Sequence, residues 1–139
     1  MLLEALIAIL IFSVGVLAIV RLQGYAVKQS TDAEFRSLAA VLANDLISRM
    51  WGTDRAPETL KTEFGTPSGG GYQAWYETVA ASGLPNVTDT NDRPTVTVEN
   101  APGLTDATQV TITMTWRSPG DDPQDPRHSY VTAVVLKQD

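Results

Sequence analysis

The sequence contains no cysteine among its 139 residues, and it has a single histidine, His128. Without thiols the chain has no disulfide framework, no Cys-ligated zinc site and no cysteine nucleophile. One imidazole also excludes a metal site built from clustered histidines. No arrangement of serine, histidine and carboxylate suited to acid–base catalysis appears elsewhere. We therefore expect no enzymatic activity and no cofactor.

Charge is scarce at one end of the chain. The formal net charge is −6, and the sequence pI is about 4.6. Residues 1–24 carry only Glu4 and Arg21, which cancel, so the negative charge belongs to the remainder. An acidic surface repels the phosphate backbone of nucleic acids. We expect no nucleic-acid partner.

The first twenty residues are almost wholly apolar, with Glu4, Ser13 and Gly15 as the only exceptions. A helix of twenty residues is roughly 30 Å long, which matches the hydrocarbon core of a bilayer. A cleavable signal peptide usually has a basic start and a shorter apolar core, and this segment has neither feature. It predicts a retained membrane anchor, with Arg21 and Lys28 as the first cations at one membrane face.

Glu4 is the unusual residue in this segment. An ionisable side chain within a membrane helix is costly and is a functional candidate by default. The alternative is that a carboxylate in the first helical turn interacts favourably with the helix dipole and reaches the lipid headgroups. The second interpretation leaves unexplained why no basic or polar residue surrounds the glutamate, and at this stage both remain open.

A long amphipathic helix follows the apolar segment. Residues 22–51 contain no proline, and Trp51-Gly52 followed by Pro57 is typical of a helix end. Gly15 and Gly24 are either hinge candidates or sites of close helix packing. We expect residues 1–24 to be the transmembrane and assembly half of the helix, and 25–139 to be a head domain that includes the helical segment 25–51. The predicted packing stripe of this segment comprises Phe35, Leu38, Leu42 and Leu46.

The pattern of residues that follows the long helix predicts a small sheet. Residues 52–71 are rich in glycine, proline and threonine and predict an irregular connection. Four strands are then expected within 72–137, and they cover Tyr72–Ala81, Thr95–Glu99, Gln109–Trp116 and Ser129–Lys137. The strict alternation in the third strand predicts one buried and one wet face. The sequence therefore predicts an α+β fold in which a long N-terminal helix packs on an antiparallel sheet of about four strands.

A few polar and aromatic residues are candidates for a binding site. Asp121, Asp122 and Asp125 could ligate a calcium ion, but their spacing matches no calcium loop, and turn residues in a solvated hairpin explain them better. His128, which follows this loop, is expected to be a surface histidine. Three tryptophans could form a ligand platform, although tryptophans in a small domain more often belong to the core. They are Trp51, Trp75 and Trp116.

The N-terminal residues carry a resemblance to a known family. The segment Leu2-Leu3-Glu4-Ala5-Leu6-Ile7-Ala8-Ile9-Leu10, continued by Phe12-Ser13-Val14-Gly15-Val16-Leu17, resembles the start of type IV pilins and their pseudopilin relatives. Leu22-Gln23, the segment 72–76 and the strand at 110–117 look more like the PilV-type minor pilins than like a major pilin. The resemblance is strong over residues 2–24, and it implies the lollipop shape of a pilin.

The resemblance implies a role for Glu4. In pilin filaments this carboxylate neutralises the N-terminal amine of a neighbouring subunit inside a helical bundle, which offsets the cost of burying either charge alone. In the family a prepilin peptidase removes a leader, the new N-terminus is methylated, and the glutamate lies one position further along. The chain therefore looks like a mature pilin without its first residue, or one whose Met1 was added.

Two family features are missing here. Many major pilins have a helix-breaking proline near the position of Leu22, so Gly15 and Gly24 are the remaining candidates for local melting on assembly. Many pilins also close a C-terminal loop with a disulfide. Without cysteine, the last segment is expected to be held by strand pairing alone.

The resemblance implies a structural subunit: a minor pilin that primes type IV pilus assembly and sits in a tip complex, with links to adhesion and twitching motility. Its partners would be other minor pilins, the major pilin, prepilin peptidase, the inner-membrane assembly platform and a tip adhesin. The location would be the inner membrane of a Gram-negative bacterium, with the head in the periplasm, and then the extracellular pilus. The alternatives are a minor pseudopilin of a type II secretion system and a membrane-anchored periplasmic binding domain.

Overall fold

The computed structural model describes residues 1–138 and divides the chain into two compact units. The first comprises Met1–Glu34, and the second begins at Phe35. Helix α1, Leu2–Trp51, is the only secondary-structure element of the first unit and also supplies the first element of the second. The long N-terminal helix predicted from the sequence is therefore present, and it runs through Gly15 and Gly24 without interruption.

The second unit contains a three-stranded antiparallel sheet, one strand fewer than predicted. The strands are β1, Thr95–Asn100, β2, Ala107–Trp116, and β3, His128–Lys137, in the order β1-β2-β3. Ile112 lies at the centre of the register, opposite Val96 on one side and Thr132 on the other. The alternation of the central strand is as predicted, because Val110, Ile112 and Met114 are fully buried.

The segment predicted as the first strand, Tyr72–Ala81, is instead helix α3, Gly70–Ala80. Its three fully buried residues, Tyr72, Trp75 and Val79, are three and four positions apart and therefore share one helical face. The prediction was wrong because the aromatic and β-branched residues favoured a strand, whereas burial of one helical face determined the conformation.

The connection predicted to be irregular contains a second short helix, α2, Pro57–Phe64. Proline stands at the start of the helix, where its fixed φ is suitable and no N–H is needed. Leu60 and Phe64, one turn apart, are buried. A Cβ on Gly71 would lie 2.5 Å from Cε1 of Phe64, so the glycine run that follows α2 permits close approach of the two short helices.

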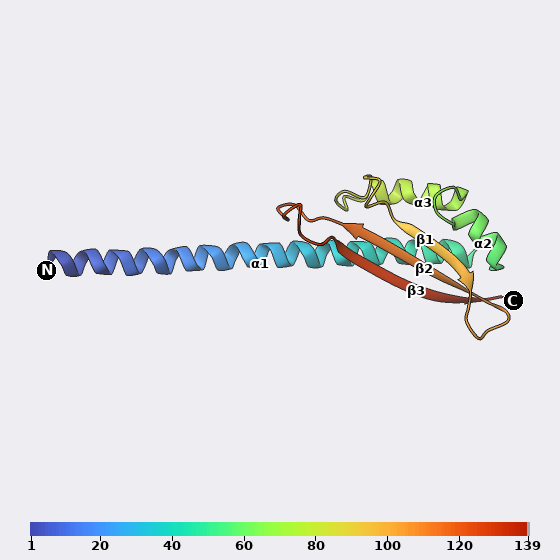
Figure 1. Cartoon of the computed structure of the whole chain (residues 1–139), viewed down its shortest axis with the longest axis horizontal. Coiled ribbons are helices and arrows are strands. Elements are labelled where there is room, and N and C mark those ends of the chain that lie inside the picture. Colours follow the sequence, from blue (N-terminus) through green and yellow to red (C-terminus); the bar gives the residue numbers. More distant parts are fainter. Residues whose placement is uncertain (139) are drawn as a thin grey trace. The chain divides into compact units, whose positions relative to one another are not determined.

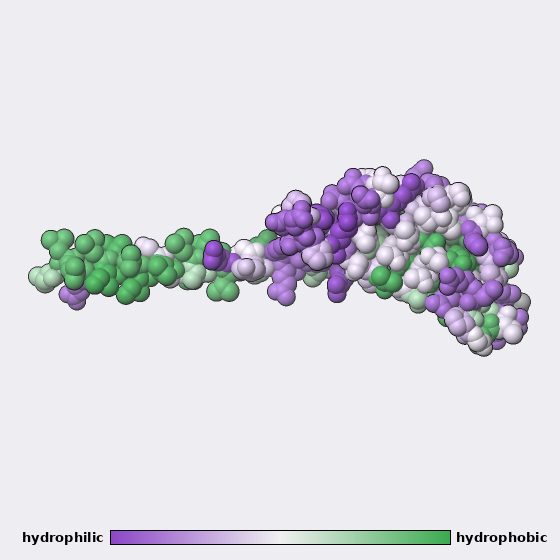
Figure 2. Space-filling model, viewed as in Figure 1, coloured by the Kyte–Doolittle hydropathy of each residue, from purple (hydrophilic) through white to green (hydrophobic). Residues whose placement is uncertain are grey.

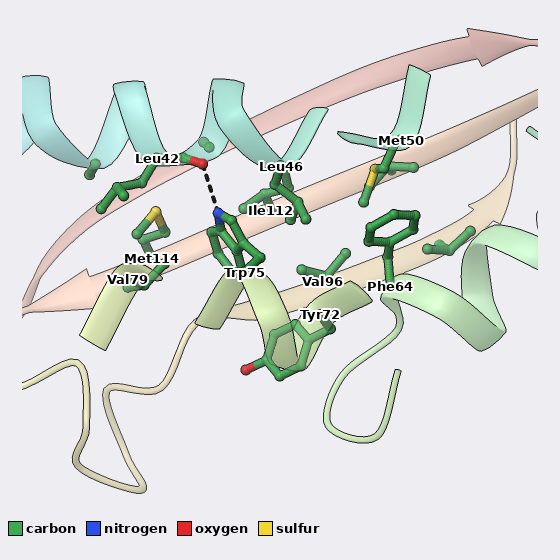
Figure 3. Packing of buried hydrophobic residues seen from close by; sticks show 14 of the residues in the cluster. Leu42, Leu46, Met50, Phe64, Tyr72, Trp75, Val79, Val96, Ile112 and Met114 are labelled. Atoms are coloured by element: carbon green, nitrogen blue, oxygen red, sulfur yellow. Dashed lines mark hydrogen bonds between the residues drawn. The ribbon is translucent and has the colours of Figure 1, made fainter. Parts of the chain in front are cut away.

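One hydrophobic core joins all of these elements in the second unit. Figure 3 shows it between the last turns of α1, the helices α2 and α3, and the inward-facing residues of the sheet. Figure 1 shows α2 and α3 near β1, whereas β3 forms the other edge of the sheet. The helices therefore cover one face of the sheet, which gives the two-layer α+β arrangement expected from the sequence. The buried part of α1 consists of Ala39, Leu42, Ala43, Leu46 and Met50.

Candidate functional site

The apolar segment of α1 is exposed throughout. Leu2, Leu10 and Phe12, for example, are 84%, 66% and 72% exposed. Figure 2 shows that most of the visible surface of this segment is apolar. Among the described residues α1 is the one helix long and apolar enough to cross a membrane, by length and composition. An apolar surface of this extent needs lipid or other helices around it.

Glu4 lies in the first turn of α1. Ala8, Ile11 and Gly15 follow it four, seven and eleven positions later, so all four residues share one face of the helix. The small residues on this face would let a second helix approach closely, next to the carboxylate. Ser13 differs from Glu4, because its hydroxyl donates a hydrogen bond to the carbonyl of Ile9 within the same helix (2.7 Å).

Gly15 and Gly24 have open surroundings. A Cβ built on either glycine meets no atom within 4 Å, apart from the backbone of its own helix. Close packing within this chain therefore does not account for them. Packing against helices of other chains and local melting on assembly both stay as predictions.

The predicted packing stripe of the second unit lies against the core. Leu42 and Leu46 are buried, and Phe35 and Leu38 are partly buried and pack against the same cluster. A hydrogen bond fixes the position of α3 on this stripe, because Nε1 of Trp75 donates to the carbonyl of Leu42 (2.9 Å). Figure 3 shows the indole pointing at α1 between neighbouring apolar side chains.

The acidic loop before β3 is organised as a turn. Asp121 accepts hydrogen bonds from the backbone N–H of Ser118 (2.8 Å) and pairs with Nε2 of His128 (3.1 Å). Asp122 accepts a hydrogen bond from the N–H of Gln124 (2.8 Å). These carboxylates therefore stabilise the loop, and the described residues contain no group of three or more acidic or histidine side chains that could hold a metal ion.

His128, expected to be a surface histidine, is partly exposed and also contacts a neighbouring ring. Its side chain is only 29% exposed, and its ring stacks on Trp116 with 5.8 Å between ring centroids. The tryptophans do not form a shared platform. Trp75 and Trp116 are buried in the core, whereas Trp51 is 50% exposed at the end of α1 beside the guanidinium of Arg55.

Tyr72 belongs to a small cluster on α3 with a structural role. Its hydroxyl donates to the carbonyl of Pro94 (2.7 Å), and Arg93 lies over the ring of Tyr76 at 4.1 Å. Burial raises the pKa of Tyr72 above its ordinary value, and a hydrogen bond from Arg93 opposes this effect. The cluster ties α3 to the start of β1 and contains no acid–base pair suited to catalysis.

Strand pairing alone does not hold the C-terminal part of the chain, which corrects the expectation based on the missing disulfide. Arg127, just before β3, forms an ion pair with the buried carboxylate of Asp92. At the other end of β3, Nε of Arg55 donates to the carbonyl of Lys137 (2.8 Å). Sequence analysis missed these contacts because their partners lie far apart along the chain. The turn residues around Asp92 gave no pairing signal.

The chain matches no family model, no curated protein and no solved structure. The feature that stands out is the exposed apolar segment with Glu4 on it.

Proposed function

We propose that the protein is a non-enzymatic fibre subunit, a minor pilin of a type IV pilus that helps to prime assembly and sits in a tip complex. The observation that carries the proposal is a carboxylate, Glu4, on an otherwise apolar and exposed helical segment. The same helix continues into the core of a small α+β unit without a break. A passive anchor needs no carboxylate at this place.

In the proposed mechanism, lipid surrounds the apolar segment of α1 before assembly, and helices of neighbouring subunits replace the lipid in the fibre. Glu4 then pairs with the N-terminal amine of an adjacent subunit. Both charges are stabilised only when they meet, because an unpaired charge in an apolar bundle is strongly unfavourable. Pairing would therefore select the axial position at which a subunit enters the fibre. Ala8 and Gly15, on the same face as Glu4, leave room for the neighbouring helix.

The second unit fits the role of the exposed part of such a subunit. It carries five of the six net negative charges, since the charged residues of the first unit sum to −1. Its buried hydrophobic cluster includes residues of α1, of both short helices and of the sheet. An acidic unit with such a core suits a role in contacts between subunits.

The proposal is tested by replacing Glu4 with alanine and measuring how much of the protein is recovered in fibres sheared from the cell surface. The matched control is Ser13→Ala in the same helix, because the Ser13 hydroxyl is satisfied by its own helix. We expect Glu4→Ala to abolish recovery in fibres at an unchanged level in the membrane, whereas Ser13→Ala is neutral. Equal recovery of Glu4→Ala and the parent protein would contradict the mechanism. Recovery in a secretion apparatus, in place of a pilus, would favour a pseudopilin.

A further inference from the structure

The edge of the sheet formed by β3 is unoccupied in the described part of the chain. β3 pairs with β2 on one side only, and Figure 1 shows no strand beyond it. It is ten residues long, which makes it a long edge strand. Edge strands of this kind offer a row of unpaired N–H and C=O groups to any chain that can lie alongside.

The direction of the backbone groups follows from the opposite edge of the sheet. The N–H of Val96 donates to Oγ1 of Thr66 (2.6 Å), and its C=O accepts from the N–H of Thr66 (3.4 Å). Both groups of Val96 therefore point away from β2. In an antiparallel ladder the two groups of one residue point to the same side, and successive residues alternate. Ile112 lies opposite Val96, so its N–H and C=O must point toward β3. Thr132 is its partner there, so the N–H and C=O of Thr132 point toward β2.

The same alternation identifies the residues whose groups point outward from β3. They have odd numbers, and Lys137 confirms the assignment because its carbonyl accepts a hydrogen bond from Arg55 (2.8 Å). Among the described residues no hydrogen bond reaches the other four from outside the ladder. All four are exposed. They are Ser129, Val131, Ala133 and Val135.

Between its ends, this edge has none of the features that usually protect an edge strand. Proteins block such edges with charged side chains, proline, bulges or a covering segment. Residues 129–136 contain no charged residue, no proline and no glycine, and the pairing with β2 has no bulge. Val131 and Val135 are 58% and 48% exposed. The edge at β1, by contrast, is covered at Val96 by Thr66.

The surroundings of β3 define the chemistry of the segment that fits. Two exposed carboxylates, Asp122 and Asp125, precede the strand, and the cation of Lys137 ends it. A pocket of about 260 Å³ beside Val135, lined also by Leu104, has room for an apolar side chain. An added antiparallel strand therefore fits best with an acidic residue at its start, apolar residues in its middle and a basic residue at its end.

We propose that β3 binds an extended segment of another protein, which joins the sheet as a fourth, antiparallel strand. The segment pairs with the outward N–H and C=O groups of residues 129–135, and its charged ends meet Lys137 and the acidic loop. This inference does not depend on the role proposed for Glu4.

The first test measures peptide binding to the full chain in detergent micelles by fluorescence anisotropy. The probe is a labelled Asp-Thr-Val-Thr-Val-Thr-Val-Lys peptide, and the matched control has its two charged ends exchanged. We expect the probe to bind with a dissociation constant below about 1 mM and the control to bind more weakly. Methylating the backbone nitrogens of one alternate set of residues should abolish binding, and methylating the other set should not. Equal binding of the two methylated peptides would overturn the proposal, as would stronger binding of the exchanged peptide.

The second test changes the protein. Ala133→Pro removes an outward N–H without removing a bond to β2, and Asn100→Pro makes the same change at the β1 edge, where the alternation also directs the N–H outward. We expect Ala133→Pro to weaken probe binding at least about fivefold, the effect of one lost hydrogen bond, and Asn100→Pro to leave it unchanged. If no peptide binds up to about 1 mM and the parent chain forms a dimer that Ala133→Pro dissociates, the occupant is a second copy and the proposal is wrong.

Discussion

Two buried tryptophans allow a direct measurement of what one hydrogen bond contributes to the stability of the second unit. Trp75 and Trp116 are 0% and 1% exposed, so replacing either with phenylalanine removes a similar volume from the core. Their indole N–H groups differ. Trp75 donates to the carbonyl of Leu42, whereas Nε1 of Trp116 has no hydrogen-bond partner among the described residues. The pair of variants therefore separates hydrogen bonding from packing.

The magnitude follows from the two environments. Trp75→Phe loses a hydrogen bond with a net contribution of about 0.5–1.5 kcal/mol, in addition to the packing loss. Trp116→Phe suffers the same packing loss, but it also removes an unsatisfied buried donor, which relieves a penalty of about 1–3 kcal/mol. The two effects add, so we expect Trp75→Phe to be less stable than Trp116→Phe by about 1.5–4.5 kcal/mol.

The assay is urea unfolding of the full chain in mild detergent, followed by near-ultraviolet circular dichroism, which reports on packed aromatic side chains of the head. The difference between the urea midpoints of the two variants, multiplied by a common slope, gives the difference in their free energies of unfolding. If Trp75→Phe proves no less stable than Trp116→Phe, the hydrogen bond between α3 and α1 does not contribute as the structure indicates.

Three further predictions concern the stability of the second unit. Asp92→Asn should lower the free energy of unfolding by about 1–3 kcal/mol, because it removes the charge partner of Arg127, itself 41% exposed; urea unfolding without such a loss would contradict this. Because the pKa of Tyr72 is raised in the folded protein, the unfolded chain loses the phenol proton first as pH rises. The free energy of unfolding should therefore fall as pH rises above 10.0. Tyr72→Phe should reduce this fall in unfolding curves measured across that pH range. Gly71→Ala should lower the thermal unfolding midpoint because its Cβ would overlap Phe64, while Gly24→Ala, in open surroundings, should not; equal midpoints would refute the packing argument.

The sequence was informative where one regular pattern dominated. In β2 the alternation of Val110, Ile112 and Met114 with threonines has a single structural solution, and the strand lies where it was predicted. The long helix was equally clear, because no proline precedes Pro57. Its packing stripe follows from helical spacing alone.

The sequence misled where two patterns competed. Tyr72, Trp75 and Val79 are spaced for a helix, but their residue types favour a strand, and a preceding glycine run suggested a loop. Only the close approach of α3 to Phe64 explains why glycine is needed there. The ion pair of Asp92 with Arg127 had no sequence signal, because tertiary folding brings the two residues together.

The proposed pairing of Glu4 with an amine requires a particular environment in the assembled fibre. The most direct measurement is a fibre structure at side-chain resolution that contains this subunit. We predict that the Glu4 carboxylate lies within about 4 Å of the N-terminal amine of an adjacent subunit, inside a bundle of apolar helices. A fibre in which Glu4 faces solvent, with no amine beside it, would contradict the claim.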